Sequence, residues 1–170
     1  MTIPDSRWGR EGSLVSRVGQ RFASTRPGSW TIRKLMPWDR KLLMRTRGRR
    51  TLLGPMGAQM LVLETIGRKS GQPRLSPLVF SRADGDAVIV VGSNFGQEHH
   101  PAWTGNLIAH PQARVVAGGV EVPVVAELLS GAEAEEGWQK MVDATSVYAV
   151  YKTRTDRDIR VFRLTPLLDG

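Results

Sequence analysis

The chain has 170 residues, and its 41% hydrophobic content is enough for one domain with a real core, or for one domain with an appended arm. The absence of cysteine excludes disulfides, thiolate metal sites and a cysteine nucleophile, and is compatible with a reducing cytoplasm. Its three histidines include the pair His99-His100, but adjacent side chains seldom converge on one ion. We therefore expect no metal site.

The distribution of charge and apolar residues narrows the class of protein further. No window approaches the roughly 18 consecutive apolar residues of a membrane span, and the N-terminus lacks the apolar core of a signal peptide. A cytoplasmic protein is expected. The net charge of +8 is uneven, because residues 1–50 carry thirteen Lys and Arg against three acidic residues. The excess positive charge belongs to this N-terminal part, where it can act on polyanions or anionic lipid.

The first 33 residues differ in composition from the rest of the chain. Residues 1–33 are rich in Arg, Ser and Gly with scattered apolar side chains, which predicts a weakly structured basic arm. From Lys34 to Arg47 the apolar residues fall on one stripe, which predicts a basic amphipathic helix. Pro37 is expected in the first turn of this helix, where proline is tolerated. The folded domain is expected to span residues 34–170.

Strand patterns and turn residues alternate from residue 60 onward. Strands are predicted over residues 60–66, 75–82, 87–92, 113–117, 120–129 and 159–164. The turn at 83–86 and the pair Gly118-Gly119 are typical of hairpins, so the strands should be antiparallel. No GxGxxG motif follows a strand, which argues against a dinucleotide-binding Rossmann unit.

Three helices are predicted among these strands. They run from His100-Pro101 to about His110, from a capping box of Ser130 and Glu133 to about Val142, and over a short segment that holds Tyr148 and Tyr151. Six short antiparallel strands with inserted helices indicate an α+β fold built on a closed or partly closed β-barrel.

The segment GRKSGQPR, residues 67–74, is the most informative motif. It follows an apolar strand and places three cations around two glycines and a proline. Gly67 and Gly71 permit positive φ and close backbone approach, Ser70 adds a hydroxyl donor, and Arg74 can grip a phosphate or carboxylate through two hydrogen bonds. The same residue types also favour an ordinary solvated turn, so the motif alone leaves both interpretations open.

Three further motifs follow in order and give the chain a family resemblance. They are Gly92-Ser93-Asn94, HPAWTGNL over residues 100–107, and YAVYKTRTDRDIRVFRL over residues 148–164. With the 67–74 motif, they make residues 35–166 similar to the deazaflavin-dependent nitroreductases and quinone reductases. This resemblance implies a split β-barrel of the flavin-binding, pyridoxamine-oxidase-like type, with coenzyme F420 as cofactor. Related split barrels bind flavin mononucleotide or haem and commonly dimerise, so the ligand and a homodimer stay open.

The resemblance also implies a set of cofactor-binding residues. F420 carries a phosphate and an acidic glutamate tail on a flat deazaflavin, so its site needs cations at one end and a shaped apolar slot at the other. By resemblance, the phosphate and tail are bound by Arg68, Lys69, Ser70, Gly71 and Arg74. The deazaflavin is lined by Pro77, Ser93, Asn94, Trp103 and Asn106. By residue type alone, Trp103 also fits a core position and Asn106 a brace for a neighbouring loop.

The implied activity is a reductase that moves a hydride from C5 of reduced F420 to a small-molecule acceptor, namely a quinone, nitroaromatic or activated enone. Ser93, Tyr148 or solvent would supply a proton, and Tyr148 and Tyr151 would lie over the substrate. The chain departs from the family where Asn94 to Glu98 replace a basic, glycine-rich loop. Thr145 and Val79 also replace tyrosines of some nitroreductase relatives. These departures keep a noncatalytic F420 carrier or sensor as the alternative.

The basic N-terminal arm allows two kinds of partner. It has no helix-turn-helix, zinc-finger or RNA-binding motif, so no specific nucleic-acid partner is expected. Trp8, Trp30 and Trp38 interleaved with Arg and Lys are typical of an interfacial segment attracted to anionic lipid. We therefore predict peripheral association with the inner face of the cell membrane, with a solvated tail as the alternative.

Overall fold

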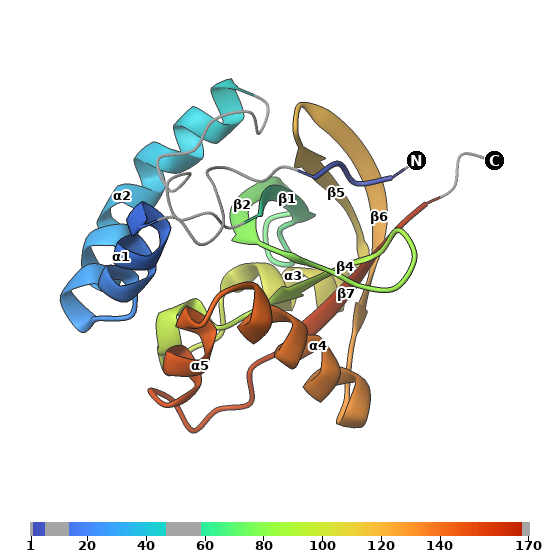
Figure 1. The fold of residues 1–170 in the computed structure, drawn as a ribbon. Coiled ribbons are helices and arrows are strands. Elements are labelled where there is room, and N and C mark those ends of the chain that lie inside the picture. Colours follow the sequence, from blue (N-terminus) through green and yellow to red (C-terminus); the bar gives the residue numbers. More distant parts are fainter. Residues whose placement is uncertain (1, 6–13, 47–58, 168–170) are drawn as a thin grey trace.

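The structure is a computed structural model that describes residues 2–5, 14–46 and 59–167. Within these residues, a curled seven-stranded sheet carries helices on its outside and at one end (Figure 1). The elements in chain order are α1 (Leu14–Ala23), α2 (Arg26–Arg45), β1 (Met60–Ile66), β2 (Pro73–Val79), β3 (Ser81–Arg82), β4 (Val88–Val91), the 3-10 helix η2 (Asn94–Gly96), α3 (Ala102–Ala109), β5 (Gln112–Ala117), β6 (Val120–Leu128), α4 (Gly131–Ala144), α5 (Val147–Lys152) and β7 (Val161–Pro166).

The sheet curls because one segment of the chain contributes to both of its ends. The strands pair antiparallel in the order β2-β1-β5-β6-β7-β4-β3, yet only Phe80 separates β2 from β3 in the chain. The side chain of Phe80 is 1% exposed, and its backbone N–H donates to the carbonyl of Gln59 at 3.1 Å. The predicted α+β split barrel is thus confirmed. The single strand predicted over 75–82 is two strands, because the pairing partner changes at Phe80 from β1 to β4.

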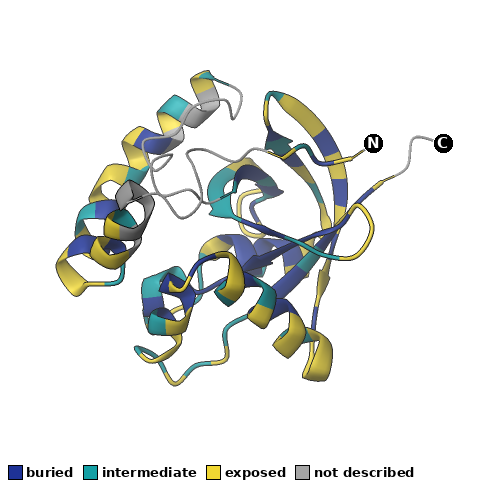
Figure 2. Ribbon diagram, viewed as in Figure 1, coloured by how far each residue is buried: buried dark blue, intermediate teal, exposed yellow. Residues whose placement is uncertain are grey.

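Two hydrophobic clusters hold the helices to the sheet, and β4 belongs to both. Val88 and Val90 point into the barrel, where Trp103 and Leu107 of α3 join the core. Ile89 and Val91 point the other way, into a second cluster formed with α4 and α5. All four β4 residues are therefore buried, as the dark strand in the centre of Figure 2 shows.

The prediction of a weakly structured arm over residues 1–33 is wrong for residues 14–23 and 26–33, which are helical. The amphipathic helix starts at Arg26 rather than Lys34, so Pro37 lies inside it and not in its first turn. Thr25 precedes the helix, and its hydroxyl accepts from the N–H of Gly28 at 3.0 Å, as a helix N-cap does. The physical reason is tertiary, because Ala23 and Ile32 are buried in the second cluster.

Two local predictions have different outcomes. Gly118 and Gly119 both have positive φ, 56° and 87°, which confirms the primed hairpin turn between β5 and β6. The capping box before α4 is wrong, since the Ser130 side chain makes no cap hydrogen bond. Glu133 is drawn instead into an ion pair with Arg163 of β7, at 2.6 Å. None of the described helices is both long enough and apolar enough to cross a bilayer.

Candidate active site

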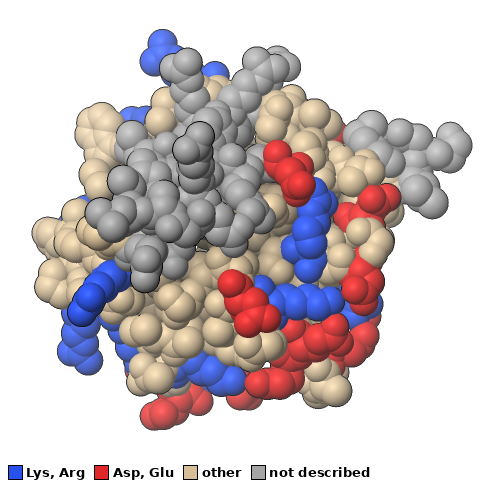
Figure 3. Space-filling model, viewed as in Figure 1, with Lys and Arg blue, Asp and Glu red and all other residues tan. Residues whose placement is uncertain are grey.

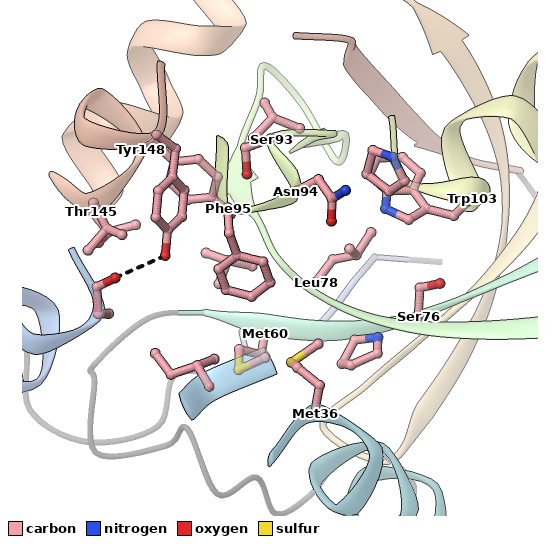
Figure 4. Close-up of a pocket in the computed structure, with 18 of the residues that line it drawn as sticks. Met36, Met60, Ser76, Leu78, Ser93, Asn94, Phe95, Trp103, Thr145 and Tyr148 are labelled. Carbon is pink, nitrogen blue, oxygen red and sulfur yellow. Dashed lines mark hydrogen bonds between the residues drawn. The ribbon is translucent and has the colours of Figure 1, made fainter. Parts of the chain in front are cut away.

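A cavity of about 410 Å³ lies between β2, the η2 loop, the start of α3, α5 and the two N-terminal helices (Figure 4). This volume is within the range of about 300–1,000 Å³ that small-molecule and cofactor sites occupy. Its wall is mainly apolar. The lining residues are Ala23, Ile32, Met36, Pro37, Met60, Leu75, Ser76, Pro77, Leu78, Val79, Val91, Ser93, Asn94, Phe95, Pro101, Trp103, Thr145, Val147, Tyr148 and Tyr151.

Three buried hydroxyl groups in this wall have no hydrogen-bond partner in the part of the chain that the structure describes. Ser93, Thr145 and Tyr148 are 6%, 7% and 8% exposed, and their side-chain oxygens make no hydrogen bond within the described part of the chain. Buried polar groups in native proteins are nearly always hydrogen-bonded, so hydroxyls that face a cavity are available to a ligand. Burial raises the pKa of Tyr148, with a smaller contribution from Tyr151, so the phenol keeps its proton at neutral pH.

Arg157 holds the loop that carries Ser93. Its guanidinium donates to the carbonyls of Gly92 at 2.9 Å, Ser93 at 2.7 Å and Gln97 at 2.8 Å. It also contacts Nδ1 of His100 at 3.1 Å. Burial, then Arg160 and Arg157, lower the pKa of His100, so a neutral ring accepts this hydrogen bond.

The loop needs this support because its backbone is strained. Asn94 and Phe95 have φ of 49° and 58°, a left-handed conformation that few side chains adopt. Asn94 Nδ2 donates to the carbonyl of His99 at 3.0 Å, which fixes the amide at the cavity wall. The strained loop is therefore held both from within and by Arg157.

The 67–74 turn presents unpaired cations beside β2. Arg68, Lys69 and Arg74 are exposed, and none pairs with a carboxylate among the residues that the structure describes. Gly71 has φ of 64°, as predicted, and a Cβ on Gly67 would lie 2.7 Å from Ser70 Oγ, so a side chain there would displace that hydroxyl. The turn thus keeps three positive charges free for an anion.

Asn106 of α3 ties this turn to the cavity. Its Oδ1 accepts from the backbone N–H of Arg68 at 3.1 Å, and its Nδ2 donates to the buried hydroxyl of Thr65 at 3.0 Å. Trp103, one turn earlier on the same helix, lines the cavity and packs on Phe162 with ring centroids 5.6 Å apart. A single helix therefore positions both the cationic turn and one wall of the cavity.

The structure divides the predicted site residues into two groups. The cavity wall includes Pro77, Ser93, Asn94, Trp103, Tyr148 and Tyr151. Outside it lie Arg68, Lys69, Ser70, Gly71, Arg74 and Asn106. Tyr151 also differs from Tyr148, because its phenol donates to the carbonyl of Ala23 at 3.4 Å.

Sequence reasoning missed the contribution of the N-terminal helices to the wall. Ile32 and Met36, four residues apart and hence on one face of α2, were the available signal. No group of three or more His, Asp or Glu side chains placed to hold a metal ion occurs in the described ranges.

Comparison with known proteins decides the family. The model of the F420H(2)-dependent quinone reductase family matches residues 38–166. The chain belongs to this family. It is an F420-dependent reductase, and coenzyme F420 is its cofactor.

Individual relatives agree with this assignment. The F420H(2)-dependent quinone reductase Rv1261c of Mycobacterium tuberculosis is 33% identical over 114 residues, which cover 65% of this chain and 76% of the relative. The solved structure of an F420-H2 dependent reductase, FDR-A, is 37% identical with a TM-score of 0.57, covering 62% of this chain and 92% of that one. A structure described as a domain-swapped dimer is 34% identical with a TM-score of 0.58, and the match covers 75% of this chain and 97% of that one.

Two observations indicate that the residues of this F420-dependent reductase fit the cofactor. The exposed cations of the 67–74 turn lack carboxylate partners among the described residues, as an anion-binding segment requires. The adjoining cavity is apolar with unpartnered buried hydroxyls, as a slot for a flat heteroaromatic ring requires.

The state of the tyrosines gives a direct test of the cavity. Tyr148 and Tyr151 are the two tyrosines of the chain, and burial raises the pKa of both above the ordinary value of 10. At pH 10, where the tyrosines of the guanidinium-unfolded protein are about half ionised, we expect the folded protein to show less tyrosinate absorbance than the unfolded protein.

The pKa values of the two phenols are higher in the folded protein than in the unfolded protein. Their contribution to the free energy of unfolding is therefore complete below the unfolded-state pKa, and it is lost as the pH rises through the folded-state pKa values. Coincident titration curves for the folded and unfolded protein would show that the tyrosines are open to solvent and that the described wall is wrong.

Proposed function

We propose that this reductase transfers a hydride from reduced F420 to a quinone that occupies the α5 side of the cavity. The observation that carries the proposal is the pair of hydroxyls, Thr145 and Tyr148, which have no hydrogen-bond partner among the described residues and lie in a mainly apolar wall. A flat quinone matches such a wall with its ring, and its carbonyl oxygens accept hydrogen bonds from the hydroxyls. Nitroaromatic and activated-enone acceptors carry similar oxygens and are a broader form of the same proposal.

The roles proposed for individual residues follow their positions. Reduced F420 supplies the hydride when bound. Arg68, Lys69 and Arg74 hold its acidic tail, with Ser70 and Gly71 shaping the turn around it. The ring is lined by Pro77, Ser93, Asn94 and Trp103, while Asn106 acts by holding the turn against α3. Tyr148 orients the acceptor and is a proton donor, as is Ser93. Tyr151, which is bonded to Ala23, positions this wall.

The experiment that tests this function follows the oxidation of reduced F420 on addition of menadione, a simple naphthoquinone. We expect acceptor-dependent oxidation by the wild type. Tyr148→Phe should lower kcat/KM about tenfold, because it removes one hydrogen bond to a developing charge. The affinity for F420 should be unchanged in that variant.

Lys152→Gln, on the exposed side of α5, is the matched control and should behave as wild type. F420 binding without acceptor-dependent oxidation, across quinones, nitroaromatics and enones alike, would favour the carrier or sensor and reject the reductase proposal.

We further propose that the outer face of α2 attaches the protein to anionic membrane at the inner face of the cell membrane. Trp30 and Trp38 are 55% and 68% exposed, and Lys34 and Lys41 lie over their rings at 5.7 and 5.5 Å. These positions fall on one helix face. In Figure 3 the acidic side chains gather toward α4 and the β3–β4 turn, on the opposite side from α2. Exposed Trp beside Lys suits a headgroup layer, and this would bring the enzyme to a lipid-soluble quinone.

Liposome sedimentation tests the α2 face directly. The double variant Trp30→Ser/Trp38→Ser should lose most binding to vesicles that contain anionic lipid, and binding of the wild type should fall as salt is raised. The variant Val125→Ser/Leu128→Ser removes two exposed apolar side chains of β6 and should sediment like the wild type. Equal sedimentation of both double variants would reject α2 as the attachment site.

A homodimer is also proposed, and one observation supports it. A relative of 34% identity is described as a domain-swapped dimer.

A further inference from the structure

The N-terminal helices form a wall of the active-site cavity that the family match does not include. Ala23, Ile32, Met36 and Pro37 line the cavity, and all four precede residue 38, where the match begins. Ala23 and Ile32 are 0% and 7% exposed and belong to the same hydrophobic cluster as Tyr148. In Figure 4, Met36 enters from α2 and faces the same space as Phe95 and Leu78. The wall is therefore packed against the acceptor side of the cavity.

A small set of polar contacts attaches this wall to α5. Arg154 Nη1 donates to Ser29 Oγ at 2.9 Å, and Nη2 donates to the carbonyl of Ser24. The Ser29 hydroxyl in turn donates to the carbonyl of Ala23 at 2.8 Å, which also accepts from the Tyr151 phenol. All these acceptors lie at the corner between α1 and α2. The corner is tight, because a Cβ on Gly28 would collide with the carbonyl of Phe22.

Arg154 also contacts two other parts of the cavity. Its guanidinium lies over the ring of Tyr151 at 5.4 Å, and Tyr151 packs edge-on against Phe95 at 5.6 Å. A Cβ on Gly96 would lie 2.6 Å from the Cβ of Arg154, so the arginine is pressed against the η2 loop. One side chain thus joins the α1–α2 corner, α5 and the loop that carries Asn94 and Phe95.

We propose that the α1–α2 pair is the specificity-determining wall for the acceptor, and that Arg154 is the residue that positions it. The inference rests on the proposed quinone reductase activity. With the corner held, Ile32 and Met36 close the cavity around a bare naphthoquinone ring and limit the space for substituents. A bidentate guanidinium suits this role because its two donors fix orientation as well as distance.

The test compares two probes, menadione and a naphthoquinone that carries a two-unit isoprenoid chain, by calorimetric binding to the full chain with oxidised F420 present. For Arg154→Gln, the dissociation constant of menadione should rise about tenfold, since charge-assisted hydrogen bonds that hold its wall are lost. The chain-bearing quinone should change less than threefold. Met36→Ala should shift the ratio of the two dissociation constants in the same direction. This variant shortens a side chain of the wall itself, whereas Arg154→Gln removes the contacts that hold the wall in place.

Three controls separate positioning from general damage. Arg154→Lys keeps a charge and one donor and should recover part of the menadione affinity. Lys152→Gln removes a cation from the same helix without touching the corner, and should match the wild type. The dissociation constant of F420 should stay within about twofold of wild type in all variants, because Arg154 lies away from the cationic turn.

An unchanged ratio in both Arg154→Gln and Met36→Ala would overturn the proposed wall, as would failure of the wild type to bind either quinone. Binding of menadione without oxidation of reduced F420 is a separate result. It would reject the proposed function, while the dissociation constants would still decide the role of the wall.

Discussion

The passage of the chain through Phe80 is the constraint on which the site depends. Because one extended segment supplies both ends of the strand order, the sheet must curl, and β2 is held at the position where the curl meets the helices. Every residue of β2 from Leu75 to Val79 then contributes to the cavity wall. The cationic turn at residues 67–74 leads directly into this strand. A charged end and an apolar slot are therefore consecutive parts of one hairpin, as a cofactor with an acidic tail and a flat ring requires.

Three side chains distant from the turn in sequence keep this arrangement rigid. Asn106 fixes the turn to α3, Arg157 holds the strained loop after β4, and Arg154 attaches the N-terminal helices to α5. Each of these three side chains makes its hydrogen bonds mainly to backbone groups or to buried hydroxyls. These polar groups would otherwise have to be hydrogen-bonded by water. Preorganisation of this kind lets the cavity wall keep its shape before a ligand arrives.

The sequence was informative wherever structure is determined locally. The turn at residues 67–74, the Gly118-Gly119 hairpin and the helix that begins near Pro101 each depend on residues within one turn of one another, and each was predictable. The family motifs predicted the cofactor, and the match to the F420H(2)-dependent quinone reductase family confirms that prediction. Trp103 has the core position that its residue type allows and is also part of the cavity wall, while its contact with the deazaflavin stays a prediction.

Features that depend on distant partners were not predictable from one sequence. Residues 14–33 look polar and weakly structured until Ala23 and Ile32 find the cluster formed by α4 and α5. Glu133 fits a capping box until Arg163, thirty residues later, competes for its carboxylate. Likewise, nothing local distinguishes Phe80 from the strand residues around it. The contribution of α1 and α2 to the acceptor wall follows from such long-range packing.

The central claim is that the cationic turn and the cavity form one cofactor site, with the turn binding the acidic tail. The most direct measurement is a fluorescence titration of the wild type and of Arg68→Gln/Lys69→Gln/Arg74→Gln with full-length F420 and with a tail-less deazaflavin. We predict that the wild type binds full-length F420 more tightly. In the triple variant, both ligands should bind with nearly equal affinity, close to that of the tail-less ligand for the wild type. A preference for full-length F420 that persists in the triple variant would contradict the claim.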